Sequence, residues 1–265
     1  YPGIFNDAVV GVEAKKLYDD AQKMLDRIIA QRSLQANGVI GFYPAVRTET
    51  DDVNIFKKEG ESKPFATFHF LRQQNKKAQN LPNFSLADFI QPQGADHIGA
   101  FTVTIQGIEP HIKKFIANHD DYNKIMLQVL ADRLAEAFAE LLHERVRKEF
   151  WGYAGNEHFS NEELIKEEYS GIRPAPGYPA CPDHTEKYKL FQLLGGEEAT
   201  GITLTESLAM YPASSICGWY FAHPQSQYFG IGKIQKDQVE DYARRKGMKI
   251  EDVERWLRPV LEYDA

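Results

Sequence analysis

The thirteen residues from Ile172 to His184 restrict what the chain can form more than any other segment does. They include four prolines and one glycine. Proline fixes φ, donates no backbone hydrogen bond and pushes the preceding residue to extended geometry, so this segment can be neither a helix nor a central strand. We therefore predict a stiff, extended loop that loses little conformational freedom when it binds a ligand.

Three residues of this loop have properties that a binding site uses. Arg173 can hold a carboxylate through two parallel hydrogen bonds. Gly177 can adopt positive φ or let a ligand approach the backbone, because it has no Cβ. Tyr178 adds a flat ring and a hydroxyl. Two interpretations stay open: a rigid surface connection between two helices, or a binding site, which so many special residues in one loop favour.

Composition and charge exclude several function classes. The chain has 265 residues, 43% hydrophobic and 26% charged, which is typical of a globular protein with a sizeable core. A net charge of −7 argues against general binding to nucleic acid or to an anionic membrane surface. Neither a membrane-spanning apolar run nor a signal peptide is recognisable. Cys181 and Cys217 are too few for a secreted disulfide framework, so we expect a cytoplasmic protein.

Helical spacing of apolar residues predicts one long helix, capped by Asp121 and ending near Trp151. It would be about 45 Å long, enough to span the domain. Ser160 and Glu163 form a capping-box pattern for a short helix that ends at Gly171. Other helices are expected over 12–34, 85–90 with a Ser85 cap, 185–194 before Gly195 and Gly196, 236–246 and 251–258.

Alternating and β-branched segments predict the strands. The pair Asn37-Gly38 is typical of a tight turn, which would end the first helix. Strands without helices between them favour antiparallel pairing. The chain is therefore expected to be α+β, a single domain over 1–265 with a bent antiparallel sheet flanked by helices, including one long central helix. The predicted strands are 39–46, 53–57, 66–71, 98–105, 202–210, 214–222 and 227–234.

The pattern Arg173-x-x-x-Gly177-Tyr178-Pro179-x-Cys181-Pro182-x-His184 resembles the S-adenosylmethionine-binding signature of the activation domain of cobalamin-dependent methionine synthase. The resemblance runs from about Tyr1 to the C-terminus. The chain starts without an initiator methionine, so we expect the C-terminal fragment of a larger enzyme. Further similar segments are 36–41, 131–137, 143–147, 151–153 and 237–247.

The resemblance implies a reactivation module. In that family cobalt cycles between methylcobalamin and cob(I)alamin, and occasional oxidation gives inactive cob(II)alamin. The module presents S-adenosylmethionine, a low-potential donor such as flavodoxin supplies an electron, and the methyl group passes from sulfonium to cobalt. The whole enzyme transfers methyl from methyltetrahydrofolate to homocysteine. The implied partners are a cobalamin-binding module, which holds most of the cobalamin, and the electron donor. The family's zinc belongs to another module.

A site for S-adenosylmethionine needs a cation for the carboxylate, an anion for the ammonium and aromatic surface for the adenine. Arg173 suits the carboxylate, and the resemblance implies Asp96 as the acidic partner. The other implied contacts are the backbone of Ala175, Gly177 and Tyr178 near the nucleoside, Tyr228 and Phe229 beside the ligand, and Glu136 and Glu167 facing the pocket or the cobalamin.

Simpler interpretations of these residues stay open when the family is set aside. Tyr228 and Phe229 could belong to the core of a strand, and Asp96 could be a turn or cap residue. Asp132, Glu136, Glu140 and Glu144 recur every four residues, which mostly indicates a solvated helix face. We exempt Asp132 and Glu136 from that interpretation.

No metal site and no catalytic residue are expected in this chain. Cys181-Pro182-Asp183-His184 outlines half a zinc site with Cys217 and His223 as remote candidates, but closed zinc sites show two such short spacings. No nucleophile motif and no glycine-rich strand-to-helix loop are present, which argues against a Rossmann-type site. The rival function is a stand-alone S-adenosylmethionine-binding or sensing domain without a catalytic partner.

Positive charge gathers near the C-terminus of this acidic chain. The ordinary interpretation is a set of cations at a helix C-terminus and on a solvated face. The alternative is a docking surface for an acidic electron donor such as flavodoxin. The residues are Lys233, Lys236, Arg244, Arg245, Lys246 and Lys249.

Overall fold

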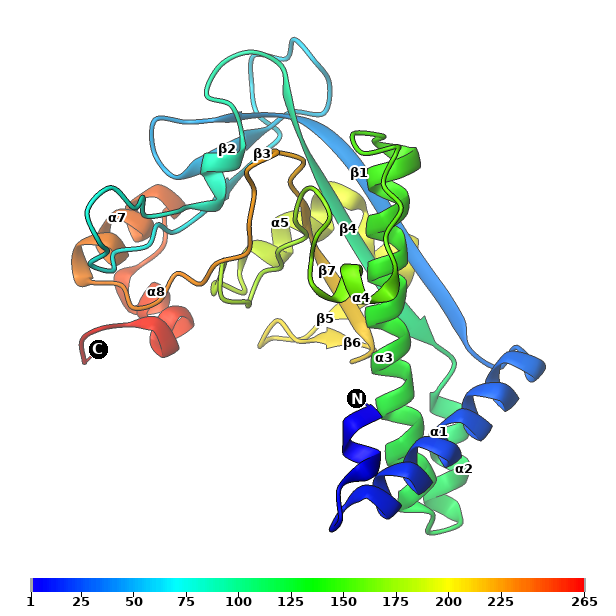
Figure 1. Ribbon diagram of the computed structural model, residues 1–265. Coiled ribbons are helices and arrows are strands. Elements are labelled where there is room, and N and C mark those ends of the chain that lie inside the picture. The colour runs from blue at the N-terminus through cyan, green and yellow to red at the C-terminus, as the bar shows by residue number, and fades with distance from the viewer. Residues whose placement is uncertain (1, 265) are drawn as a thin grey trace.

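The computed structural model describes residues 2–264, so Tyr1 and Ala265 lie outside the described residues. Its centre is a curled antiparallel sheet of five strands in the order β3-β2-β1-β4-β7 (Figure 1). This confirms the predicted α+β class and the bent antiparallel sheet. The strands are β1 (Gln35–Arg47), β2 (Asp52–Ile55), β3 (Ala66–His69), β4 (Asp96–Gln106) and β7 (Ser215–Tyr220), and a separate pair is formed by β5 (Thr203–Leu204) and β6 (Met210–Tyr211).

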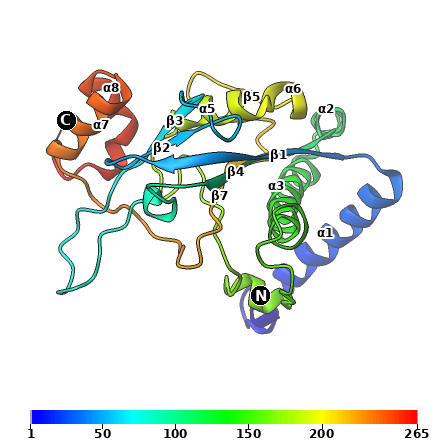
Figure 2. The ribbon, with the colours of Figure 1, turned by 90° about the horizontal axis from the view of Figure 1, so that it is seen from above.

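Strand β4 is buried along most of its length because helices cover both faces of the sheet. Figure 2 shows α3 (Asp121–Arg145) on one face and α5 (Glu186–Leu194) with α6 (Gly196–Thr200) on the other. Side chains of β4 alternate between the two faces, as strand geometry requires. Ile98 and Ala100 pack in the cluster that contains Leu190 of α5, whereas Phe101 packs in the cluster that contains Leu142 of α3.

The long central helix is confirmed, with a different cap from the one predicted. The side chain of Asp120, not Asp121, accepts the backbone N–H of Asn123 at 3.0 Å. A π-helical turn over Val146–Phe150 continues α3 to the predicted end near Trp151. The remaining helices are α1 (Gly11–Gln31), α2 (Glu109–Ala117), α4 (Asn161–Ile165), α7 (Lys236–Lys246), α8 (Ile250–Leu257) and the short 3-10 turns Pro2–Asn6, Leu86–Phe89 and Arg258–Val260.

The turn predicted at Asn37-Gly38 is wrong, because both residues lie inside β1. A Cβ on Gly38 would lie 3.1 Å from the ring of Phe138 and from Val103. The glycine therefore serves the close approach of α3 to the sheet. The chain leaves α1 one turn earlier, at Arg32, which has a φ of 49°.

The strand predicted over 227–234 is also wrong. The segment is extended, but its backbone bonds to loops: the N–H of Ile231 donates to Pro179 at 2.8 Å, and that of Ile234 donates to Val260 at 2.9 Å. Its apolar pattern reflects burial of these two isoleucines against α7 and α8. The strand predicted over 202–210 contains only β5 and the first residue of β6. Helices α2 and α6 were not predicted.

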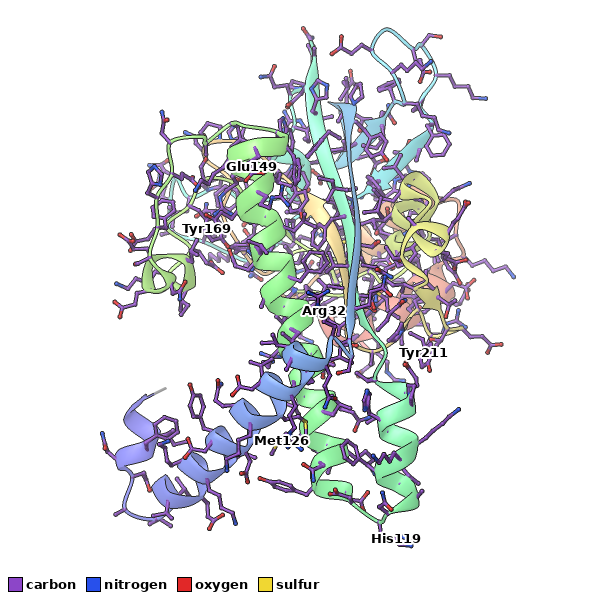
Figure 3. All side chains as sticks on the ribbon, turned by 90° about the vertical axis from the view of Figure 1, so that its right-hand side faces the viewer. Arg32, His119, Met126, Glu149, Tyr169 and Tyr211 are labelled. Atoms are coloured by element: carbon purple, nitrogen blue, oxygen red, sulfur yellow. The ribbon has the colours of Figure 1, made fainter. Side chains whose placement is uncertain are left out.

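The short helix predicted to reach Gly171 ends at Ile165, although its Ser160–Glu163 capping box is present. Glu167 has a φ of 57°, which an α-helix cannot accommodate. The chain from Glu167 to Tyr169 instead runs back beside α3, where Figure 3 labels Tyr169 next to the upper part of that helix.

Helices α1, α2 and the first half of α3 form a lobe that stands away from the sheet (Figures 1 and 3). Its small core contains Met24, Met126 and Leu127. We refer to it below as the helical lobe. Over residues 2–264, no helix combines the length and the apolar character that a membrane crossing needs.

Candidate ligand-binding cleft

The loop from Ile172 to His184 attaches to the open edge of the sheet. Ile172 exchanges two backbone hydrogen bonds of 3.0 Å with Phe221, and the N–H of Trp219 donates to Pro174 at 2.9 Å. Because β7 is the last strand of the sheet, the loop satisfies backbone groups that the edge would leave unpaired. The prediction of a segment that is neither helix nor regular strand is confirmed.

Gly177 is required by the shape of this loop. It has a φ of 91°, and its N–H donates to the carbonyl of Cys181 at 2.7 Å. A Cβ built on it would lie 2.2 Å from the ring of His184. Gly177 therefore shapes the turn that holds Ala175 and Tyr178.

Between this loop and α3 lies a cleft of about 490 Å³. Seven residues predicted from the sequence line it, namely Glu136, Glu167, Arg173, Ala175, Tyr178, Tyr228 and Phe229. Six further lining residues were not predicted as contacts: Phe101, Ala139, Pro174, Pro179, Ala180 and Ile216. Most of these six are apolar neighbours of predicted residues along the loop or one helical turn away.

The guanidinium of Arg173 is held by three side chains. Its Nη2 lies 2.6 Å from Oε2 of Glu140, and its Nη1 donates to the hydroxyl of Tyr169 at 2.9 Å. The same Nη1 lies 3.3 Å from Nδ1 of His143. Burial opposes the charge on Arg173, but Tyr228, Tyr169 and Glu140 outweigh it and raise the pKa of Arg173. The cleft therefore contains a fixed, fully charged cation.

His143 beneath the cleft is neutral. Burial, together with the charges of Arg147 and Arg173, holds the pKa of His143 well below its ordinary value. A neutral imidazole can accept from Arg173 through Nδ1 only when its proton is on Nε2. The ring also stacks on Tyr220, with centroids 5.2 Å apart and planes 14° apart. These contacts leave Glu140 as the single negative charge among the three groups that hold Arg173.

Aromatic surface borders the other side of the cleft. The hydroxyl of Tyr228 accepts the backbone N–H of Arg173 at 3.0 Å, so this ring is fixed to the loop. Tyr178 is 58% exposed and presents its ring to solvent at the entrance. Phe229 is packed from behind by Phe84 and Phe89. The segment that was predicted as a strand thus serves as a wall of the cleft.

Asp96 is not brought together with Arg173. It lies at the start of β4, where it pairs with Ala45 of β1. Its carboxylate accepts the backbone N–H groups of Gln91 at 2.8 Å and of His97 at 2.7 Å. Asp96 lines a separate hollow with Lys58. Its place fits the turn interpretation, and its role as acidic partner stays a prediction from the resemblance.

Glu140 was missed as a site residue. The sequence places it on the same four-residue row as Glu136 and Glu144, which we interpreted as a mostly solvated face. In the structure Glu136 lines the cleft, Glu140 pairs with Arg173, and Glu144 pairs with Lys148. Asp132 is exposed and does not line the cleft. The signal that could have found Glu140 is its position one helical turn after Glu136.

The basic cluster near the C-terminus is only partly a surface. The side chains of Arg245 and Lys246 are each 4% exposed. Arg245 pairs with Asp52 and Asp241, whereas Lys246 pairs with Asp183 and Glu186. These two cations hold α7 against the rest of the fold, so the hypothesis that they dock a partner is wrong. Arg244, at 70% exposed, stays on the surface.

The possible half zinc site is used for internal contacts. The carboxylate of Asp183 bonds to Lys246 and to the hydroxyl of Tyr242, which lies 2.8 Å away. Cys181 and Cys217 are buried free thiols, and burial raises the pKa of Cys217 to about 12. Among residues 2–264, no three His, Cys, Asp or Glu side chains gather in an arrangement that could hold a metal ion.

Two comparisons with known proteins show what this chain is similar to. The family model described as "Vitamin B12 dependent methionine synthase, activation domain" matches residues 1–247. A solved structure described as "Crystal Structure of the MetH Reactivation Domain bound to AdoHcy" is 56% identical in sequence and has a TM-score of 0.94. The match covers 100% of this chain and 82% of that chain.

Proposed function

The chain belongs to the family of the activation domain of vitamin B12-dependent methionine synthase, and from this membership we propose that its cleft beside Arg173 binds S-adenosylmethionine. The main observation behind the proposal is that a fixed cation, two carboxylates and aromatic rings line the same cleft. Support also comes from the similar reactivation domain, whose structure contains the demethylated form of this ligand, AdoHcy (S-adenosylhomocysteine).

The residues of the cleft fit each part of the ligand. Arg173 can hold the carboxylate of the methionine end through a charge-assisted hydrogen bond. Glu136 and Glu167 offer negative charge for the ammonium and the sulfonium. The rings of Tyr178 and Tyr228 offer flat surface for adenine. The cleft volume of about 490 Å³ lies in the range of small-molecule sites.

The chain's part in the reaction is to bind and orient. Bound S-adenosylmethionine supplies an electrophilic methyl group, which is used together with one electron for reductive methylation of inactive cob(II)alamin. Arg173, supported by Glu140 and Tyr169, fixes the methionine end, and the rigid loop presents Ala175 and Tyr178 without losing much entropy. The carboxylates favour a cationic ligand in the cleft.

The activation domain serves a methyltransferase, the vitamin B12-dependent methionine synthase. We propose that its partners are the cobalamin-binding module of that enzyme and a low-potential electron donor such as flavodoxin. We also propose a cytoplasmic location, which the two free buried thiols support.

Calorimetric titration of the chain with S-adenosylmethionine tests the proposal. We expect one binding event per chain, with S-adenosylhomocysteine as a competitor for the same site. An unrelated adenosine nucleotide such as AMP, which lacks the methionine end, should bind much more weakly. Failure of a folded chain to bind S-adenosylmethionine would contradict the proposal, as would equal binding of AMP.

A further inference from the structure

A second hollow lies in the helical lobe, between α1, α2 and α3. Its volume is about 370 Å³, which falls within the usual range of small-molecule sites. Leu127 lines it, whereas Glu136 lines the cleft described above, so the two are about 14 Å apart along α3. None of its lining residues belongs to the cleft.

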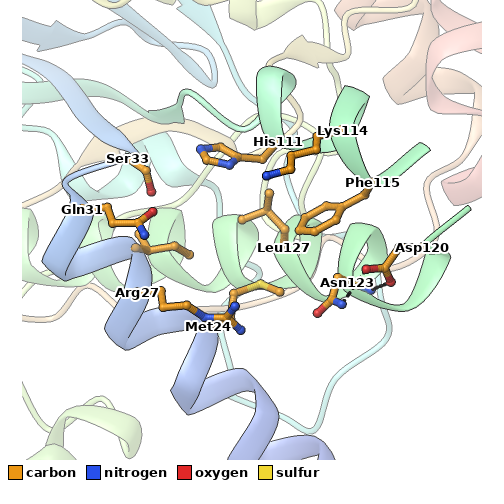
Figure 4. Close-up of a pocket in the computed structure, with 11 residues that line it drawn as sticks. Met24, Arg27, Gln31, Ser33, His111, Lys114, Phe115, Asp120, Asn123 and Leu127 are labelled. Atoms are coloured by element: carbon orange, nitrogen blue, oxygen red, sulfur yellow. Dashed lines mark hydrogen bonds between the residues drawn. The ribbon is translucent and has the colours of Figure 1, made fainter. Parts of the chain in front are cut away.

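The floor of this hollow is apolar and its rim is polar. Met24 and Leu127 are 6% and 3% exposed, and they form the floor with Ile28 and Phe115. Figure 4 shows Arg27 and Gln31 of α1 across the hollow from His111 and Lys114 of α2, with Leu127 between them. Apolar walls with a few convergent polar groups are the usual composition of a ligand site.

The cations of the rim have no internal counter-ion. Among residues 2–264, neither Arg27 nor Lys114 takes part in an ion pair, although the chain carries a net charge of −7. The single carboxylate of the lining belongs to Asp120, and it is occupied as the cap of α3 through two bonds to Asn123 of 3.0 and 2.7 Å.

Another hollow of the same chain has a different charge balance. It is lined by Arg47 and Arg72, and these arginines are neutralised by Asp88 and Asp51. In the helical lobe, by contrast, the lining has two cations, Arg27 and Lys114, against the one carboxylate of Asp120, and no ion pair within residues 2–264 includes either cation. An incoming anionic group can therefore interact with Arg27 and Lys114 without displacing an existing ion pair.

We propose that the hollow of the helical lobe is a second binding site, which takes a small organic anion. The anionic group lies between Arg27 and Lys114, and the apolar body covers Met24, Phe115 and Leu127. A simple inorganic anion would leave the apolar floor exposed to water. A neutral apolar molecule would leave Arg27 and Lys114 without a counter-ion. Only a ligand with both parts matches the site.

Such a ligand bridges α1 and α2. These helices reach the sheet through α3 and the ends of β1 and β4, and the lobe has only a small buried core. A ligand that binds only the folded lobe stabilises it by mass action. Occupancy should therefore raise the melting temperature of the chain in proportion to the logarithm of ligand concentration.

The test titrates the chain with 1-naphthalenesulfonate, which joins an apolar ring system to one anionic group. The matched probes are 1-naphthalenemethanol, which keeps the rings and lacks the charge, and sodium sulfate, which keeps the charge and lacks the rings. We expect saturable binding of the sulfonate, and binding of both matched probes that is at least about tenfold weaker.

The double variant Arg27→Glu with Lys114→Glu should lower the affinity for 1-naphthalenesulfonate by about tenfold or more. Lys113→Glu, an exposed neighbour on α2 outside the hollow, makes a matched control and should stay within about twofold. S-adenosylmethionine binding and the thermal melt of the double variant check that it folds. Absence of sulfonate binding, unchanged affinity in the double variant, or equally tight binding of the uncharged probe each overturn the proposal.

Discussion

Nη2 of Arg173 lies 2.6 Å from Oε2 of Glu140, so the cation of the cleft is paired before any ligand arrives. Tyr169 and His143 contact Nη1 of the same guanidinium. A ligand carboxylate must therefore use the N–H groups that these contacts leave free. The arrangement gives Glu140 the role of a positioning residue, because it sets the direction of the guanidinium without lining the cleft.

Arg173→Ala should weaken S-adenosylmethionine binding by about ten- to a hundredfold, because loss of a charge-assisted hydrogen bond costs about 1.5–3 kcal/mol. Arg173→Lys should recover only part of the affinity, since an ammonium lacks the planar arrangement of donors. Calorimetric titration measures both. Arg244→Ala, at an arginine 70% exposed and outside the cleft, is the control. Parental affinity in Arg173→Ala would show that the ligand binds elsewhere.

Glu140→Ala should lower the affinity for S-adenosylmethionine about tenfold, because it leaves Arg173 free to turn away and removes its partly buried ion-pair partner. Glu140→Gln keeps an acceptor for Arg173 and should stay within a few-fold of the parent. Glu144→Gln, one helical turn further on and paired with Lys148, should change nothing. Equal effects of the Ala and Gln variants would contradict the positioning role and leave the Arg173 prediction intact.

Local patterns predicted the loop and most of the cleft because those features depend on short-range chemistry. Four prolines within thirteen residues exclude a helix and a regular strand from the loop, and the long helix follows from its periodicity. The placement of Asp96 depends instead on the register of β4 against β1, where it faces Ala45. That register is a long-range pairing, and nothing in the local sequence around Asp96 specifies it.

The other errors have the same physical origin. Gly38 follows an asparagine, as in a tight turn. The position requires glycine because the ring of Phe138, one hundred residues later in the chain, leaves little space for a Cβ. The segment 227–234 has the composition of a strand, yet its hydrogen bonds go to the loop and to the C-terminal region. Arg245 and Lys246 look like surface charges until α7 packs against Asp52 and Asp183.

Glu136→Gln should weaken the binding of S-adenosylmethionine more than that of S-adenosylhomocysteine, because only S-adenosylmethionine carries the positive sulfonium. A carboxylate–cation contact near the surface contributes about 0.2–1 kcal/mol, so the selectivity should fall by about 1.4- to fivefold. Parallel titrations with the two ligands measure it. Glu144→Gln, which pairs with Lys148 outside the cleft, is the control and should leave both affinities within about twofold. Asp96→Asn tests the acidic partner that the resemblance implies: a loss of about tenfold or more would support that role, and unchanged affinity would contradict it.

The chain by itself should bind S-adenosylmethionine and transfer no methyl group to homocysteine. The residues of the cleft bind and orient the ligand, and the sequence contains no nucleophile motif. Incubation of the pure chain with S-adenosylmethionine and homocysteine, without any corrinoid, should yield no methionine above the reagent blank. Enzyme-dependent methionine in that mixture would contradict the proposed role.

The buried ion network at the end of α7 makes a prediction about stability and pH. Lys246 contacts the carboxylates of Asp183 and Glu186, which are 2% and 0% exposed. Burial alone would raise the pKa of Asp183, but Lys246 and further hydrogen bonds outweigh it and lower that pKa below its ordinary value of 3.8. The stabilisation from Asp183 is therefore present above pH 3.8 and is lost as the pH falls through the lower folded-state pKa.

Lys246→Met should destabilise the chain by about 3–5 kcal/mol at pH 7, because it leaves the buried carboxylate of Asp183 without its cation, whereas Glu186 keeps its contact with Lys189. Without Lys246, burial raises the folded-state pKa of Asp183, so this carboxylate binds a proton more readily when the chain is folded. The loss should therefore shrink as the pH falls from 7 to 5. Lys249→Met, at an exposed position, is the matched control and should cost less than about 0.5 kcal/mol. Urea unfolding at both pH values measures the difference, and a loss that is independent of pH would show that the buried carboxylates are not the cause.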